Sequence, residues 1–421
     1  MVFEKPKLFH YKKGFVLTMS VFVLVLLLRL LLCYSEYRAF IQKPFYYTYV
    51  SVLKSYIKTK NDRSYRVLKL KSDEGLRFYT TNHEIEAFDA QRLRIKIFPN
   101  AKITFFDYMG TFYVSSQIKK RMTLPPDTKE KFVSSITSQH ENPQMGMFYA
   151  AIFFATAIDK ALRSKITTLG VSHLVALSGF HLGILWALVY GLLGVLYRPL
   201  QQRYFPYRYA MIDVGVLAMA LLGYYLYFVD YPPSLIRSFA MVLIGWLVLL
   251  MGLELLSFTF LVTVILLLLA LMPSLLVSLG FWLSVAGVFY IFLLLSYTQS
   301  WKNWLISLLV IPFGIFVLML PVVHAIFGLT SSYQLLSPLL SILFVPFYPL
   351  SMGLHLLGIG DVLDGALAYL FSFEGSSEEK LLPLWMTGMY ILLSFGAVRE
   401  RSLFYLLIIL ASLYTGYLFL Y

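Results

Sequence analysis

Residues 171–197 read VSHLVALSGFHLGILWALVYGLLGVLY and decide the class of fold. The run is apolar over the length that an α-helix needs to span a bilayer. It nevertheless contains His173, Ser178 and His181, and polar or ionisable side chains are costly in hydrocarbon. The run therefore predicts a membrane-spanning helix whose polar residues have a functional or packing role.

The whole chain has the same apolar character. Of its 421 residues, 59% are hydrophobic and 14% are charged, and a soluble protein of this length cannot bury so much apolar surface. The first apolar run, residues 15–33, follows four lysines and lacks the small-residue cleavage site of a signal peptide. It is expected to be a retained transmembrane helix with a cytoplasmic N-terminus. Further spans are predicted at 209–229, 234–253, 255–272, 275–297, 304–326, 331–356, 382–398 and 402–421, with a shorter apolar piece at 362–373.

Residues 34–145 form a polar segment that differs from the rest. They contain 19 Lys and Arg against 11 Asp and Glu, which is more than half of the 35 basic residues of the chain. The first helix should place this segment outside the cytoplasm, where long translocated domains escape the positive-inside rule. The basic excess is therefore not a topology signal, and it indicates an anionic partner.

Alternation within the polar segment predicts β-strands. Residues 92–97, RLRIKI, place Arg92, Arg94 and Lys96 on one face and apolar residues on the other. Further short strands are predicted at 65–71, 77–81, 102–106 and 111–115. About five such strands suit a small OB-like barrel, and a β-sandwich fragment fits nearly as well. The basic face is either a solvated edge strand or a surface that binds a polyanion.

The chain thus divides into four parts. We expect a cytoplasmic N-terminus and first transmembrane helix at 1–33, and an extracytoplasmic OB-like domain at 34–145. An amphipathic interfacial helix is expected at 146–170, followed by a multi-helix membrane domain at 171–421. Arginines mark the connections near 203 and 400 as cytoplasmic, and the acidic loop at 374–379 is expected outside. His355 is expected at a helix end, and Asp361 and Asp364 in a loop.

Several other apolar runs are also interrupted by polar residues. Each residue has a structural explanation: a serine can bond to its own helix, Gly179 can allow close packing, and Arg237 can reach the interface. Polar positions on many helices together favour a buried polar path. The candidates for lining it are His173, Ser178, Gly179, His181, Pro233, Ser234, Arg237, Ser284, His324, Ser337 and Ser341.

Four of these stretches resemble, in order, the motifs of the ComEC competence family. They are HLVALSGFHLGI at 173–184, PSLIR at 233–237, GFWLS at 280–284, and the segment from Pro321 to Pro346 with LSP at 336–338. The chain departs from the family where Trp282 and Ser341 replace an expected glutamine and asparagine. Its one cysteine also excludes a disulfide found in the outer domain of some members.

The resemblance implies a channel that carries single-stranded DNA across the inner membrane during natural transformation. It also implies an OB-like outer domain, an extracytoplasmic DNA receptor and a cytosolic ATPase or helicase as partners. The chain looks like a short member without the metallo-β-lactamase-like nuclease domain, because it contains no H-x-H-x-D. We therefore expect a transport protein in the lipid bilayer without catalytic residues, metal or cofactor; oligomeric state is not specified.

Two other functions compete with this reading. A transporter of another anionic polymer or lipid would also need a basic path. An intramembrane serine hydrolase would use Ser178 with His181 as its base, and that base would need a third group to orient it. No nucleotide-binding G-x-x-x-x-G-K-[ST] is present, so a partner or a gradient must drive movement.

The arrangement of polar residues on a helix favours a conduit over a catalyst. At 100° per residue, Ser178 lies about 140° from His173, and His181 lies about 80° from it. All three then occupy one half of a continuous helix, as a hydrated path requires. In the outer domain, bases would stack on exposed aromatic rings, for which the candidates are Phe78, Tyr79, Phe105, Phe106 and Tyr108.

Overall fold

The computed structural model describes residues 9, 11–60, 63–82, 91–123, 127–250, 257–373, 375 and 377–420. Glu374, which was predicted in an outer loop, lies outside them. The chain forms two compact units. One comprises Phe9–Lys131 with Ile265–Leu279, and the other comprises mainly Phe132–Val264 with Gly280–Tyr421.

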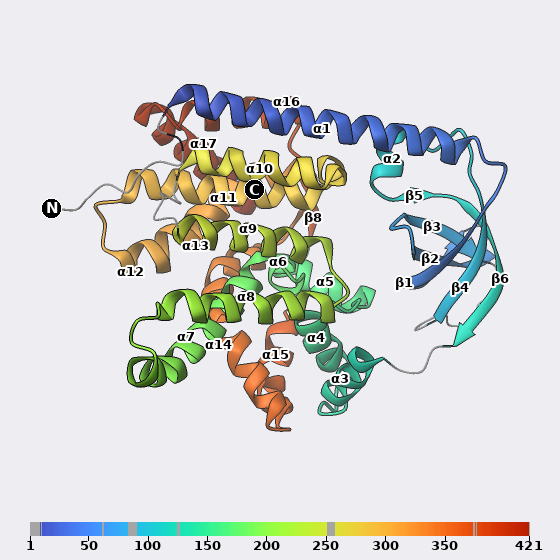
Figure 1. Ribbon diagram of the computed structural model, residues 1–421, viewed down its shortest axis with the longest axis horizontal. Helices are drawn as coiled ribbons and strands as arrows, with labels where there is room; N and C mark the ends of the chain where they lie inside the picture. Colours follow the sequence, from blue (N-terminus) through green and yellow to red (C-terminus); the bar gives the residue numbers. More distant parts are fainter. Residues whose placement is uncertain are drawn as a thin grey trace. The chain divides into compact units, whose positions relative to one another are not determined.

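The first unit contains a six-stranded sheet and helix α1 (Lys12–Ile41). The strands run in the order β5-β3-β2-β1-β4-β6, and Figure 1 shows them grouped with the short helix α2. Every pairing is antiparallel except that of β3 with β5, which is parallel. The strands are β1 Tyr46–Lys60, β2 Arg63–Ser72, β3 Arg77–Asn82, β4 Gln91–Phe98, β5 Phe112–Tyr113 and β6 Ser115–Thr123.

The core of this unit lies on the apolar face of the sheet. Leu93, Ile95 and Ile97 of β4 are fully buried, whereas Arg94 between them is exposed. The predicted alternation in this strand is therefore confirmed. Phe40, from the last turn of α1, packs into the same core.

The structure departs from the strand predictions in three places. Residues 102–106 do not form a strand, because α2 (Phe105–Met109) begins there. Thr104 caps this helix by accepting a hydrogen bond from the Asp107 N–H, and the Asp107 carboxylate accepts one from the Thr104 N–H. This reciprocal capping box outweighs the apolar alternation. The long strand β1 was missed altogether, and β6 was missed beyond the end of the strand predicted at 111–115.

The remaining elements are mostly helices. They are α3 Thr128–Thr137, α4 Pro143–Phe154, α5 Lys160–Thr168, α6 Ser172–Val175, α7 Gly179–Tyr204, α8 Ala210–Phe228, α9 Pro233–Leu250, α10 Phe258–Leu271, η1 Pro273–Val277, α11 Leu279–Thr298, α12 Asn303–Leu305, η2 Ile306–Val310, α13 Ile311–His324, β7 Leu329–Thr330, η3 Ser332–Leu336, α14 Ser337–Leu356, η4 Gly360–Leu363, α15 Asp364–Phe371, β8 Glu378–Glu379, α16 Leu384–Gly396 and α17 Arg401–Leu420.

Among the described residues, seven helices are long and apolar enough to cross a membrane. They are Lys12–Ile41, Gly179–Tyr204, Ala210–Phe228, Leu279–Thr298, Asn303–His324, Ser332–Leu356 and Arg401–Leu420. The prediction of a polytopic helical membrane protein is thus confirmed. Three predicted spans are shorter than expected, at Ser234–Leu250, Phe258–Leu271 and Leu384–Gly396.

Two apolar cores hold the second unit together. One joins α4, α5, α6 and α7 to α8, α14 and α15, and the other joins α11, α13, α16 and α17. The segment 146–170 was expected to form one amphipathic helix, but it contains parts of two helices. They are separated at Ala155, which has a φ of 58°. Most residues of α4 are buried, so this helix is interior rather than amphipathic.

Candidate functional site

The run that was expected to form one helix from 171 to 197 is broken. Residues 176–178 separate α6 from α7, and Ser178 has extended backbone angles of −139° and 179°. The prediction of a continuous helix with His173, Ser178 and His181 on one half is therefore wrong. Serine is a favoured N-cap, and here it starts a new helix at Gly179.

Ser178 and His181 cap the first turn of α7 together. The Ser178 N–H donates to His181 Nδ1 at 3.3 Å, and the Phe180 N–H donates to Ser178 Oγ at 3.3 Å. Ser178 Oγ also lies 3.2 Å from His181 Nδ1. His181 is fully buried, its ring edge-on to Phe344 and Tyr348 at 5.0 Å. Its Nε2 has no hydrogen-bond partner within the described part of the chain.

The first turn of α9 packs against the same break. Pro233 is the first residue of this helix, and the Ser234 hydroxyl donates to the Leu177 carbonyl at 2.7 Å. A Cβ placed on Gly179 would lie 3.0 Å from Ser238 Oγ. Gly179 therefore has a helix, rather than open space, beside it.

Arg237 joins the second motif to the third. It lies one turn into α9, as predicted, and is 6% exposed. Its guanidinium carbon is 6.0 Å from the Phe281 ring centre, and a Cβ on Gly280 would lie 3.9 Å from its Nη1. Arg237 Nε has no hydrogen-bond partner among the residues that the structure describes. Ser284 is half-buried in the same helix as Phe281.

The first turn of α14 brings part of the fourth motif to the break. The Ser337 hydroxyl donates to the Gly170 carbonyl at 3.1 Å, just before α6. The Ser341 hydroxyl donates to the Ser337 carbonyl at 2.8 Å and lies 3.2 Å from His173 Nε2. Since that hydroxyl is already donating, it accepts from His173. His173 itself is exposed.

His324 takes part in a separate set of contacts. It is 1% exposed at the end of α13, with Nδ1 3.0 Å from the Leu320 carbonyl and Nε2 3.0 Å from Thr330 Oγ1. These contacts stabilise the end of its own helix. The structure thus brings nine of the eleven predicted lining residues near one another, in the first, second and fourth motifs. Ser284 lies three residues after Phe281 in α11, and His324 takes part in other contacts. Whether they line a path stays a prediction.

Helix ends and one arginine lie at this break, and groups of this kind are expected to favour anions. The N-termini of α7 and α9 meet near residues 177–179, and the first turn of α14, which continues directly from η3, lies beside Gly170. Each helix N-terminus carries roughly half a positive charge, and broken membrane helices use such ends to hold anionic groups. Arg237 adds a full positive charge beside them.

The first unit presents a second candidate surface, on the polar face of β4. Three aromatic residues lie beneath the three predicted basic side chains: Phe45, just before β1, and Tyr47 and Tyr49 within it. These aromatic residues are 37% to 45% exposed. We call these six residues the basic-aromatic face. The pairs are Lys96 over Phe45 at 4.0 Å, Arg94 over Tyr47 at 5.7 Å and Arg92 over Tyr49 at 5.4 Å, measured to the ring centres.

The aromatic residues that were predicted to stack on bases lie outside the basic-aromatic face. Phe78 is fully buried, and Tyr108 packs against the same core, so neither offers a free ring. Phe105 is half-buried, Tyr79 lies under a lysine, and Phe106 is 68% exposed. The aromatic residues of β1 were missed; the run FYYTY at 45–49 does not alternate, but it is rich in residues that favour strands.

Glu74, which contacts Thr48 of β1, is held in its ionised form. Burial by itself raises the pKa of Glu74, but hydrogen bonds from Thr48, Tyr46 and Ser72 outweigh it and the pKa lies below its ordinary value. The Thr48 hydroxyl donates to Glu74 Oε2 at 2.7 Å. Burial, together with this carboxylate, raises the pKa of Tyr46 to about 12.

The described residues contain no group of three or more His, Cys, Asp or Glu side chains that could hold a metal ion. The expectation of no metal or cofactor stays a prediction. A family model described as Competence protein matches residues 154–418. No curated protein and no solved structure matches the chain. The match covers all four sequence motifs.

Proposed function

This chain belongs to the competence protein family, and we propose that it conducts single-stranded DNA across the inner membrane. Family membership indicates a role in DNA uptake for transformation. The observation that carries the finer proposal is the meeting of the N-termini of α7 and α9 at the α6–α7 break, with Arg237 one turn into α9. A bare charge at the bilayer centre costs at least about 2.5–3.5 kcal/mol, so each phosphate needs such positive groups along its path.

We also propose that the sheet of the first unit is a closed barrel of the OB type. Only Val114 separates β5 from β6, and its N–H donates to the Tyr79 carbonyl of β3 at 2.9 Å. Because β5 pairs with β3 and β6 pairs with β4, one nearly continuous strand joins both edges of the sheet. Closure of this kind removes free edges, as in OB folds that bind oligonucleotides.

The basic-aromatic face is the proposed binding surface of this barrel. Its cations would contact phosphates while exposed rings such as Tyr47 and Tyr49 stack on bases, at about 1–3 kcal/mol per base. Stacking and charge are tolerant of sequence, which suits a protein that takes up any strand. Arg92 also pairs with Asp73, so part of the positive charge is offset.

A serine hydrolase is the weaker alternative. Ser178 Oγ lies within reach of His181 Nδ1, as a nucleophile and its base would. That nitrogen also accepts from the Ser178 N–H, however, and no described acidic side chain is bonded to Nε2 to orient the ring. A base without an orienting group is a poor catalyst. We therefore propose a conduit, without nuclease activity of its own.

The partners follow from this role. We propose an extracytoplasmic receptor that delivers DNA to the basic-aromatic face and a cytosolic ATPase or helicase that pulls the strand. Because the four lysines at 5–13 predict a cytoplasmic N-terminus, we propose that the barrel lies outside the inner membrane.

Arg237→Gln is expected to lower DNA uptake at least tenfold, and Arg237→Lys should retain more activity. Glutamine keeps most of the side-chain volume but removes the charge, whereas lysine keeps the charge without the planar guanidinium. Uptake is measured in transformable cells that lack their own member of this family, at matched membrane levels of each variant. If the glutamine variant transports like wild type, Arg237 only packs against Phe281 and the proposed role of its charge is wrong.

A further inference from the structure

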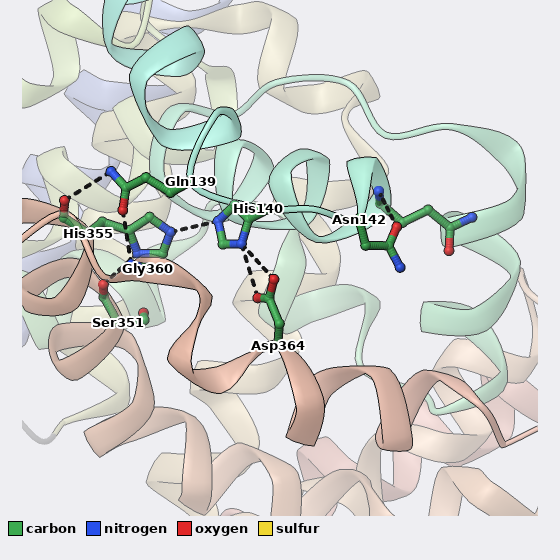
Figure 2. Close-up of polar contacts among 8 residues, drawn as sticks. Gln139, His140, Asn142, Ser351, His355, Gly360 and Asp364 are labelled. Carbon is green, nitrogen blue, oxygen red and sulfur yellow. Dashed lines mark hydrogen bonds and ion pairs between the residues drawn. The ribbon is translucent and has the colours of Figure 1, made fainter.

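A buried chain of polar side chains lies apart from the motif residues. His140, in the turn before α4, contacts His355 in the last turn of α14 and Asp364 at the start of α15 (Figure 2). The sequence predicted a helix-end role for His355, which is confirmed, and a loop position for Asp364, which is wrong because this residue begins α15. These residues are 215 and 224 positions from His140, so no local pattern could link them.

The contacts form one line of hydrogen bonds. The Asp364 carboxylate is 2.8 Å from His140 Nδ1, and His140 Nε2 is 3.0 Å from His355 Nε2. His355 Nδ1 is 2.7 Å from the Ser351 carbonyl. Gln139 also links this turn to α14 and η4. Its Nε2 donates to the His355 carbonyl, and its Oε1 accepts from the Gly360 N–H (Figure 2).

The contacts between Asp364, His140, His355 and Ser351 need three hydrogens if Asp364 is ionised, which is one more than two neutral imidazoles carry. The Ser351 carbonyl and an ionised Asp364 only accept, so both Nδ1 atoms must carry hydrogen. The contact between the two Nε2 atoms needs a third hydrogen, but two neutral imidazoles carry only two. The third proton sits either on a ring, giving an imidazolium beside a carboxylate, or on Asp364, which then donates to His140 while His140 donates to His355.

We propose that Asp364, His140 and His355 form a binding site for one exchangeable proton, and that this proton ties the turn before α4 to α14 and α15. The proton comes from water and returns to it by way of Asp364, whose side chain is 20% exposed while that of His140 is fully buried. When it leaves, two nitrogen lone pairs face each other in a buried site and the net charge becomes negative. Both changes are costly away from water.

An aromatic ring lies against both imidazoles. The Tyr149 ring stacks on His140 at 4.8 Å and 11°, and it lies 4.4 Å from His355. An aromatic face stabilises a cation placed on it. The described titratable groups in contact with His140 are Asp364, His355 and Tyr149. Glu141, beside it in the chain, and Asp361 on η4 are exposed.

The experiment measures hydrogen exchange of the amides at 138–145 in the full chain in lipid nanodiscs, between about pH 5 and pH 9. After correction for intrinsic exchange, opening of this turn should increase about tenfold per pH unit above a midpoint, which is the slope for one proton. Asp364→Asn should abolish this pH dependence, because the asparagine amide can donate to His140 Nδ1, so that a neutral His140 donates to His355 without an extra proton. Asp361→Asn is the matched control and should leave the midpoint unchanged.

His355→Gln gives the sharpest test. A glutamine amide can donate to His140 Nε2 without any extra proton, so the turn should stay protected and lose its pH dependence. The proposal would be overturned if exchange at 138–145 in wild type showed no pH-dependent opening, or if His355→Gln showed the same pH dependence as wild type. Purified wild type that retains stoichiometric zinc, lost in His355→Gln, would also overturn it, because two histidines held through Nδ1 by acceptors are a familiar metal-ligand pattern.

Discussion

Gly179→Leu is expected to abolish DNA uptake although the protein still reaches the membrane. A Cβ at this position already lies 3.0 Å from Ser238 Oγ and 3.4 Å from Ser238 Cβ. The further carbons of leucine must push α9 away from the first turn of α7, which breaks the contact of Ser234 with Leu177. Over-packing of this kind costs about 1–3 kcal/mol, and it displaces the helix that carries Arg237.

The matched control is Gly183→Leu, four residues further along the same helix, where a Cβ meets nothing within 4 Å. It should transport nearly as well as wild type. Ser178→Ala removes an N-cap worth about 1 kcal/mol and should leave partial uptake, with His181→Ala between the two extremes. A dead Ser178→Ala variant beside an active Gly179→Leu variant would mean that chemistry at the hydroxyl is essential, and the conduit would be the wrong description.

Reversing the charge of Arg92, Arg94 and Lys96 to glutamate is expected to give the second largest effect, on DNA binding. Each lost phosphate contact lowers the slope of log K against log salt by about 0.7 for a single strand, so three contacts account for about 2. Affinity at low salt should fall at least a hundredfold, because the new carboxylates also repel the strand. The measurement is a salt titration of strand binding by the full chain in nanodiscs.

The same change of net charge at other positions controls for a general electrostatic effect. Lys58, Lys102 and Lys131 are exposed and lie outside the basic-aromatic face. Their reversal to glutamate should weaken binding far less and leave most of the salt slope. Equal losses from the two triple variants would mean that the strand senses only the overall charge of the protein, and the assignment of this face would fail.

The sequence predicts some of these features well because their signals are local. Strict alternation from 92 to 97 specifies a strand with one buried face, since a strand's side chains alternate between its two faces. The apolar runs predict most of the spanning helices because length and apolar composition, both visible in the sequence, decide whether a helix can cross a bilayer. Strand β1 was missed since its exposed tyrosines carry no apolar contrast with their neighbours.

Other features depend on contacts that no local pattern reveals. The break at Ser178 is set by its capping of α7 and by Ser234 on another helix, which bonds to Leu177. A helical wheel assumes continuity, so it places Ser178 and His181 wrongly relative to His173. The pairing of His140 with Asp364 joins distant parts of the chain, and only folding brings them together.

Strand transit through the purified protein tests the central claim most directly. The full chain is reconstituted in liposomes that enclose a single-strand-binding protein, so that entry of a strand is energetically downhill without a motor. Strands recovered from the nuclease-protected lumen are counted, beside an anionic glycan of similar charge and length. The account predicts that DNA accumulates with wild type and with Gly183→Leu, not with Gly179→Leu, and that the glycan stays outside. No DNA above the level of empty liposomes, or glycan entry as fast as that of DNA, would contradict it.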